Sequence, residues 1–139
     1  MKLNHISSTE IILKKLEGKL WQLEEDLVVC CRLGVGVMYV TLKKGMITDL
    51  GSIPKIAQGW IDRANNNILP FLLHDAGYIY GGFSRDTWDS LLYQTLRLKG
   101  MGWFKAQCVY KAVSWFGESH FDNVSEATKK MVKLEWRAR

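Results

Sequence analysis

"LLHDAGYIYGGFSRDTWDSLL", residues 72–92, predicts two of the helices of the chain and contains polar residues that could form a functional site. A hydrophobic run is interrupted by His74-Asp75 and ends at Gly81-Gly82, a pair typical of a turn. Ser84 is a good N-cap for a second helix, and Asp86 lies in its first turn, where the helix dipole favours a carboxylate. The stretch therefore predicts two helices, joined by a short turn, that pack as antiparallel neighbours.

The segments before this stretch predict strands. "KLWQLEEDLVVCC" (19–31) and "GVMYVTLKKGMITD" (36–49) are rich in Val, Leu, Tyr and Trp, and glycines lie between and within them. Pro54 suits the first turn of a helix. We expect an α+β fold: a small N-terminal antiparallel sheet of two or three strands, followed by four to five packed α-helices.

Three regions are expected along the chain. Residues 1–18 form an N-terminal arm or short helix, and residues 19–121 form the α+β domain. Residues 122–139 form a basic C-terminal helix packed on that domain, because apolar residues from Val124 to Trp136 recur at roughly helical spacing.

The composition is that of an ordinary soluble protein. The chain has 139 residues, 47% hydrophobic and 24% charged, which is enough for one domain with a real core. The sequence has no apolar run of about 20 residues and no signal-peptide pattern, so we expect no membrane span and a cytoplasmic location. Three cysteines without paired spacing indicate reduced thiols rather than a disulfide scaffold or a structural zinc site.

The net charge of +5 is concentrated toward the C-terminus. Such a patch is typical either of nucleic-acid binding or of a solvated helix face. We favour the solvated face, since no nucleic-acid-binding motif accompanies the charge.

Polar residues that fall where apolar ones are expected form a candidate site. Asp49 ends a strand, His74 and Asp75 share one helix, and Arg85 and Asp89 lie one turn apart on the next. Antiparallel packing of the two helices brings His74 close to Asp89.

This set has two chemical uses. In the first, Asp89 orients His74 as a general base, with Arg85 as a third catalytic residue. In the second, Asp49, His74 and Asp75 hold one divalent cation (Mg, Ca, Mn or Zn), since oxygen-rich, cysteine-free ligation suits these ions. No organic cofactor is expected.

Candidate substrate-binding residues are Ser52 and Tyr78. A purely structural interpretation stays open beside both uses. In that case the histidine donates to a backbone carbonyl, Arg85 and Asp89 form an ordinary i,i+4 pair, and Asp49 caps a helix.

The order of motifs resembles a phage and prophage family labelled domain of unknown function thirteen fifty-three. The resemblance covers about residues 19–121, with Met46, Gly51 and Ser114 departing from the usual pattern. It rests on Gly45, Thr48, Asp49, Ser52, Ile53 and Pro54, on His74, Asp75 and Tyr78, on Ser84, Arg85 and Asp89, and on Ala112, Val113, Phe116 and Gly117. It implies a viral protein in the host cytoplasm and supplies no activity.

A second likeness is one of local chemistry. "HDAGYIY" followed by a helical aspartate is similar to the H-D-x-x-Y helix of secreted phospholipases A2. The likeness implies His74 as general base, Asp75 as a calcium ligand and Asp89 as the residue that orients the histidine, and it is one of analogy, not kinship.

These observations support three functional hypotheses. The first is a phage-encoded metal-assisted hydrolase of a phosphoester, carboxylic ester or amide. The second is a non-enzymatic phage accessory protein that binds a host or virion protein through exposed aromatic residues such as Trp60, Trp103 or Trp136. The third, nucleic-acid binding through the basic C-terminal segment, ranks lowest.

Overall fold

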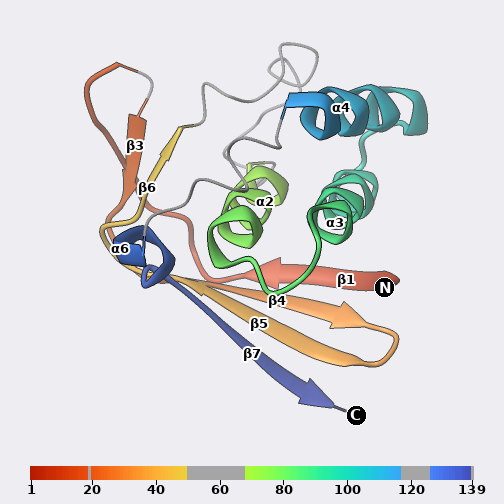
Figure 1. The fold of residues 1–139 in the computed structure, drawn as a ribbon, viewed down its shortest axis with the longest axis horizontal. Coiled ribbons are helices and arrows are strands. Elements are labelled where there is room, and N and C mark those ends of the chain that lie inside the picture. Colours follow the sequence, from red (N-terminus) through yellow and green to blue (C-terminus); the bar gives the residue numbers. More distant parts are fainter. Residues whose placement is uncertain (19, 50–67, 117–125, 139) are drawn as a thin grey trace.

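A computed structural model describes residues 1–18, 20–49, 68–116 and 126–138 of the chain (Figure 1). The described part contains seven strands in two antiparallel sheets, three helices of 12 to 14 residues and one short helical turn. The prediction of a small N-terminal sheet followed by four to five helices is wrong, because strands lie at both ends of the chain and outnumber the helices. The helix expected near Pro54 lies outside the described residues.

The larger sheet has four strands in the order β1-β4-β5-β7. Its members are β1 (Leu3–Ser8), β4 (Leu27–Leu33), β5 (Gly36–Leu42) and β7 (Val132–Ala138). Strands β4 and β5 form a hairpin whose two-residue turn follows the pairing of Leu33 with Gly36. Buried residues alternate with partly exposed ones along both strands, so one face of the sheet contributes to the core.

Strand β7 corrects the expectation of a basic C-terminal helix. Only Glu126–Lys129 is helical (α6), and Val132–Ala138 pairs with β5 along its whole length. The sequence from Val132 to Arg137 alternates strictly between apolar and charged residues, the pattern of a strand. This alternation predicts a strand, as observed. The helical spacing of the apolar residues between Val124 and Trp136 predicted a helix and is misleading here.

The N-terminal region is also extended. Instead of a loose arm or short helix, residues 1–18 supply β1 and β2 (Leu13–Lys15). Strand β2 belongs to a smaller sheet of order β2-β3-β6, completed by β3 (Leu20–Leu23) and β6 (Ile47–Asp49). Gly45, one of the glycines within the predicted strand segments, lies in the turn before β6 and has a φ of 93°, which favours glycine.

The two helices predicted from residues 72–92 are present as α2 (Leu69–Tyr80) and α3 (Arg85–Leu98). Ser84 is the N-cap of α3, accepting a hydrogen bond from the Thr87 amide at 3.2 Å. Gly81 and Gly82, both with φ of 73°, form the turn between the helices. A third helix, α4 (Trp103–Phe116), lies on the side of α2 and α3 away from the larger sheet (Figure 1).

Two groups of buried residues hold these layers together. The larger joins the sheet to α2 and α3, with Leu27, Val40 and Trp88 fully buried. The smaller joins α2, α3 and α4 through residues such as Phe71, Leu96 and Val109. Within the described ranges, no helix is long and apolar enough to cross a bilayer.

Candidate functional site

The site begins with a close approach between α2 and α3. Trp88 of α3 is fully buried, and its indole packs against Gly77 of α2 so tightly that a Cβ there would lie 2.2 Å from the ring. The indole N–H donates to the Gly81 carbonyl at 2.9 Å. Glycine at position 77 therefore lets the helices approach each other one turn away from His74.

His74 and Asp89 meet across this helix pair. The distance between His74 Nε2 and Asp89 Oδ1 is 2.7 Å, so their predicted proximity is confirmed. Asp89 is completely buried and His74 is almost so. The pair therefore lies in a low-dielectric environment, where such an interaction is stronger than in water.

Tyr78 completes the arrangement around the same oxygen. Its hydroxyl donates to Asp89 Oδ1 at 2.5 Å, and its ring lies 4.1 Å from the His74 ring, centroid to centroid. His74 and Tyr78 are one turn apart on α2, so both reach toward α3 from one face of the helix. Tyr78, predicted to bind substrate, directs its hydroxyl to the buried carboxylate.

This geometry selects one tautomer of His74. An ionised carboxylate only accepts hydrogen bonds, so a neutral His74 carries its proton on Nε2 and keeps the lone pair on Nδ1. None of the hydrogen bonds among the described residues involves Nδ1. The dyad can therefore accept a proton at Nδ1 while Asp89 stabilises the resulting imidazolium.

Asp89 is itself unusual. Its second oxygen, Oδ2, is the one buried side-chain polar atom of the described residues that lacks a hydrogen-bond partner. A buried carboxylate oxygen without a partner is costly, and a catalytic role is one explanation for such an atom in a native structure. The carboxylate is therefore held by two donors on a single oxygen.

The Tyr78 phenol is kept protonated by its surroundings. Burial raises its pKa well above the ordinary value, and the hydrogen bond to Asp89 and the charge of that carboxylate raise it further. The Arg85 guanidinium lowers the pKa of the phenol, but the net effect of the surroundings is still to raise it. Tyr78 thus acts as a fixed donor to Asp89 rather than as a titrating group.

Arg85, predicted to be catalytic, lies beside Tyr78 and also contacts the end of α4. Its Nη1 donates to the Ser114 carbonyl at 2.7 Å, in the last turn of α4. Such carbonyls have no partner inside the helix, and an arginine satisfies one of them well. Among the described residues, the ordinary i,i+4 ion pair between Arg85 and Asp89 is not formed.

The side chain of Asp75 contacts β6, whereas that of His74 contacts α3. Thr48 Oγ1 of β6 donates to Asp75 Oδ2 at 2.5 Å, which ties α2 to the smaller sheet. His74, the preceding residue, faces α3 instead. Among the described side chains no three His, Cys, Asp or Glu residues gather closely enough to hold a metal ion. The predicted metal site also includes Asp49, whose side chain lies outside the described part.

The remaining predicted residues, Asp49 and Ser52, have side chains outside the part that the structure describes. The backbone of Asp49 ends β6, opposite Leu20 of β3, but its side chain lies outside what the structure describes. Ser52 lies outside the described residues altogether. Thr48, to which no role was given, and Gly77 are the contributors that sequence reasoning missed. A glycine inside an apolar helix was the available signal, because it often marks a close approach.

Comparison with known proteins gives one match. The family model described as "Protein of unknown function (DUF1353)" matches residues 21–113. The chain belongs to this family. DUF1353 membership, expected from the motifs, is thereby confirmed, and the matched span contains His74, Tyr78 and Asp89. It leaves out β1 and β7. No curated protein and no solved structure matches the chain.

Proposed function

We propose that this DUF1353 protein is a small hydrolase in which His74 acts as general base. The supporting observation is the 2.7 Å contact between His74 Nε2 and the fully buried Asp89 carboxylate. That contact leaves Nδ1 as the basic atom of the ring.

The proposed step is the activation of water. His74 Nδ1 removes a proton from a water molecule as the water oxygen attacks a carbonyl carbon or phosphorus atom. The imidazolium is stabilised by Asp89 while Tyr78 holds the carboxylate in place. The proton then passes from Nδ1 to the leaving oxygen or nitrogen as the scissile bond breaks.

The likeness to secreted phospholipases A2 orders the substrate classes. In that likeness the later aspartate orients the histidine, which is the relation that Asp89 has to His74. We therefore place carboxylic esters first, followed by phosphoesters and amides. The likeness is one of local chemistry, so it does not extend to lipid recognition.

A divalent cation stays a separate prediction. Asp75 accepts from Thr48 through Oδ2 and His74 contacts Asp89 through Nε2, while the third predicted ligand, Asp49, has its side chain outside the described part. Elemental analysis of the purified protein, with melting curves in added Mg, Ca, Mn and Zn, measures whether one binds.

The test of the hydrolase is a panel of chromogenic esters, phosphoesters and amides. His74→Ala should abolish any activity found, and Asp89→Asn should lower kcat by about 10²–10⁴-fold, the usual contribution of a general base. Asp86→Asn, an exposed aspartate of the same helix, is the matched control and should leave the rate unchanged. Activity that survives in His74→Ala would refute the proposal.

A readout independent of substrate comes from the histidine itself. Nitrogen NMR of labelled protein should find the neutral His74 ring protonated at Nε2, and Asp89→Asn should weaken this preference. A ring protonated at Nδ1 would contradict the proposed base.

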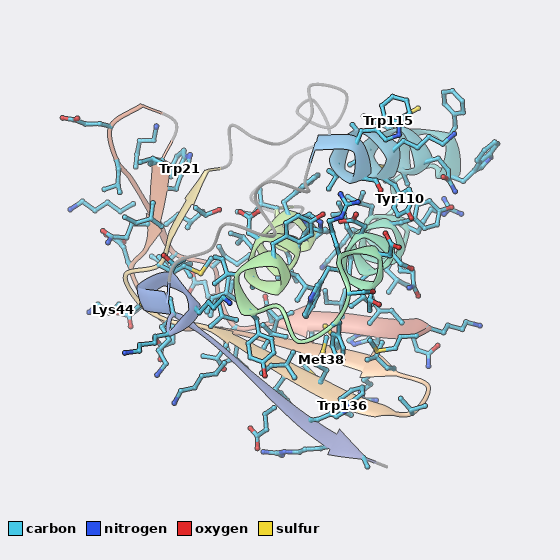
Figure 2. All side chains as sticks on the ribbon, viewed as in Figure 1. Trp21, Met38, Lys44, Tyr110, Trp115 and Trp136 are labelled. Carbon is cyan, nitrogen blue, oxygen red and sulfur yellow. The ribbon has the colours of Figure 1, made fainter. Side chains whose placement is uncertain are left out.

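A second candidate is a non-enzymatic accessory protein, favoured by the exposed aromatic residues of α4. Trp103, Phe104 and Trp115 are 63%, 66% and 77% exposed, and Trp115 stands out from α4 in Figure 2. Large exposed aromatic side chains are typical anchors of protein interfaces. An inactive panel, together with a large loss of stability in His74→Ala, would favour this candidate and make the His–Asp pair structural.

A further inference from the structure

Strand β7 forms one edge of the larger sheet, and the direction of its main-chain groups can be worked out. The Lys43 amide donates to the Met131 carbonyl at 2.8 Å, so residues 43 and 131 form a hydrogen-bonded pair. Hydrogen-bonded pairs alternate along an antiparallel ladder, so positions 133, 135 and 137 also face β5. The amides and carbonyls of Val132, Leu134 and Trp136 therefore point to the free edge, where no described residue hydrogen-bonds to them.

The side chains of β7 divide by face. Lys133, Glu135 and Arg137 are exposed and share the outer face with Tyr39 and Thr41 of β5. The face toward the helices carries Val132, Leu134 and Trp136, and Trp136 is 44% exposed, beside β7 in Figure 2. An edge strand thus presents hydrogen-bonding groups, alternating charges and an uncovered indole together.

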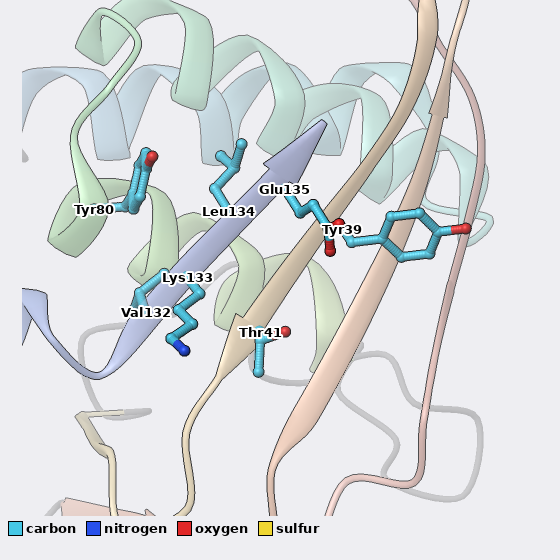
Figure 3. A pocket seen from close by; sticks show the side chains of 7 residues that line it. All are labelled: Tyr39, Thr41, Tyr80, Val132, Lys133, Leu134 and Glu135. Atoms are coloured by element: carbon cyan, nitrogen blue, oxygen red, sulfur yellow. The ribbon is translucent and has the colours of Figure 1, made fainter. Parts of the chain in front are cut away.

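A hollow lies along the same edge. It is lined by Tyr39, Thr41, Tyr80, Val132, Lys133, Leu134 and Glu135 (Figure 3). Tyr80 comes from the end of α2 and the others from β5 and β7. The hollow therefore flanks the first half of β7, whereas Trp136 lies in the second half.

We propose that β7 pairs antiparallel with β7 of a second copy of this chain, about a two-fold axis at Leu134. Lys133 then lies opposite Glu135 of the second copy, and Glu135 lies opposite its Lys133. On the other face, Trp136 of each copy lies opposite Val132 of the other. Lysine on an edge strand normally discourages pairing. Here each lysine meets a carboxylate, so the charges support it.

Other registers fit less well. The outward main-chain groups belong to even-numbered residues, so even positions must pair with even positions. An axis at Glu135 sets the two Glu135 carboxylates opposite each other. It also sets each Lys133 opposite an Arg137, which makes three pairs of like charges. An axis at Trp136 pairs Glu135 with Arg137 but leaves Lys133 without a carboxylate opposite it.

The test measures oligomeric state by sedimentation velocity or light scattering across protein concentrations. The wild-type chain should dimerise, and Lys133→Glu should weaken the dimer about tenfold or more, since it sets two carboxylates opposite each other twice. The double exchange Lys133→Glu with Glu135→Lys should restore it. Arg32→Glu is the matched control. It makes a like change of charge at an exposed position of β4, which β5 separates from β7, and it should leave the dissociation constant unchanged.

Main-chain pairing has its own test. Trp136→Pro removes an outward amide and spares the ladder with β5, whereas Trp136→Ala keeps that amide and removes the same indole. Proline should weaken the dimer more than alanine does, with melting curves confirming that both variants fold. A monomeric wild-type chain, a double exchange that stays dissociated, or equal effects of proline and alanine would overturn the proposal. An effect of Arg32→Glu as large as that of Lys133→Glu would mean that association follows net charge alone, and it would also overturn the proposal.

Discussion

At the scale of single residues, the Asp89 carboxylate depends on two donors that share one oxygen. Tyr78→Phe removes the closer of them, at 2.5 Å, and leaves the ring in place. We expect the free energy of unfolding to fall by about 1.5–3 kcal/mol, the usual value of a hydrogen bond to a charged group. Urea denaturation measures this loss. Tyr80→Phe on the same helix is the control and should change stability by less than about 0.5 kcal/mol.

The residue scale also shows how far the sequence predicts a site. The contact between His74 and Asp89 followed from two helices joined by a short turn, because helix spacing alone sets which residues face each other. The partners of Asp75 and Arg85 did not follow. Asp75 meets a threonine from a distant strand, and Arg85 meets a main-chain carbonyl of α4, which has no sequence signature. Contacts of this kind depend on tertiary placement.

At the scale of elements, Gly77 controls the spacing of α2 and α3. Gly77→Ala would place a Cβ 2.2 Å from the Trp88 ring, so the helices must separate or the indole must shift. We expect a loss of about 1–3 kcal/mol in the free energy of unfolding, as for other overpacked cores. Activity should also fall if His74 is the base, because the same shift lengthens its contact with Asp89.

The matched control for Gly77 is Gly34, in the β4–β5 turn, where an added Cβ meets nothing within 4 Å. Gly34→Ala should change stability by less than about 0.5 kcal/mol. Equal stabilities of the two variants, measured by urea denaturation, would show that the Trp88 ring can move aside for a Cβ at position 77 at little cost in stability.

The elements differ in how well the sequence predicts them. The helices α2 and α3 carry their own caps and turn glycines, so local signals suffice. Strand β7 depends instead on a distant segment, because its residues pair with β5, nearly a hundred positions earlier in the chain. Its partner decides its conformation, and helical spacing in a longer window concealed the two-residue alternation.

At the scale of the whole molecule, the sheet that supports the site is closed by segments from both ends of the chain. Strands β4 and β5 form the middle of this sheet; β1 pairs with the outer edge of β4, and β7 pairs with the outer edge of β5. Both strands lie outside the span that matches the family. The sequence predicted one α+β domain with a real core. It missed that distant segments complete its sheet, because such pairing has no local signal.

The stability of the whole fold should depend on pH through the buried thiol of Cys31. Burial, and secondly the neighbouring Cys30, raise the pKa of Cys31 from 9.0 to about 12. Above pH 9 the unfolded chain loses this proton while the folded chain keeps it, so the free energy of unfolding decreases as pH rises. One such proton is worth on the order of 1.4 kcal/mol per pH unit.

This dependence can be separated from other alkaline titrations by comparing slopes. Tyr78 contributes in the same direction at pH values above its ordinary pKa of 10.0, because its pKa is also raised in the fold. The test is urea denaturation of the wild-type chain and of Cys31→Ala at pH values between about 8 and 10.5. The variant should be less stable at pH 8, because it leaves a small cavity in the core. Its stability should nevertheless decline less steeply above pH 9, since it has no thiol at this position. Parallel slopes for the two proteins would mean that Cys31 ionises as readily in the folded chain as in the unfolded one, against its burial in the sheet.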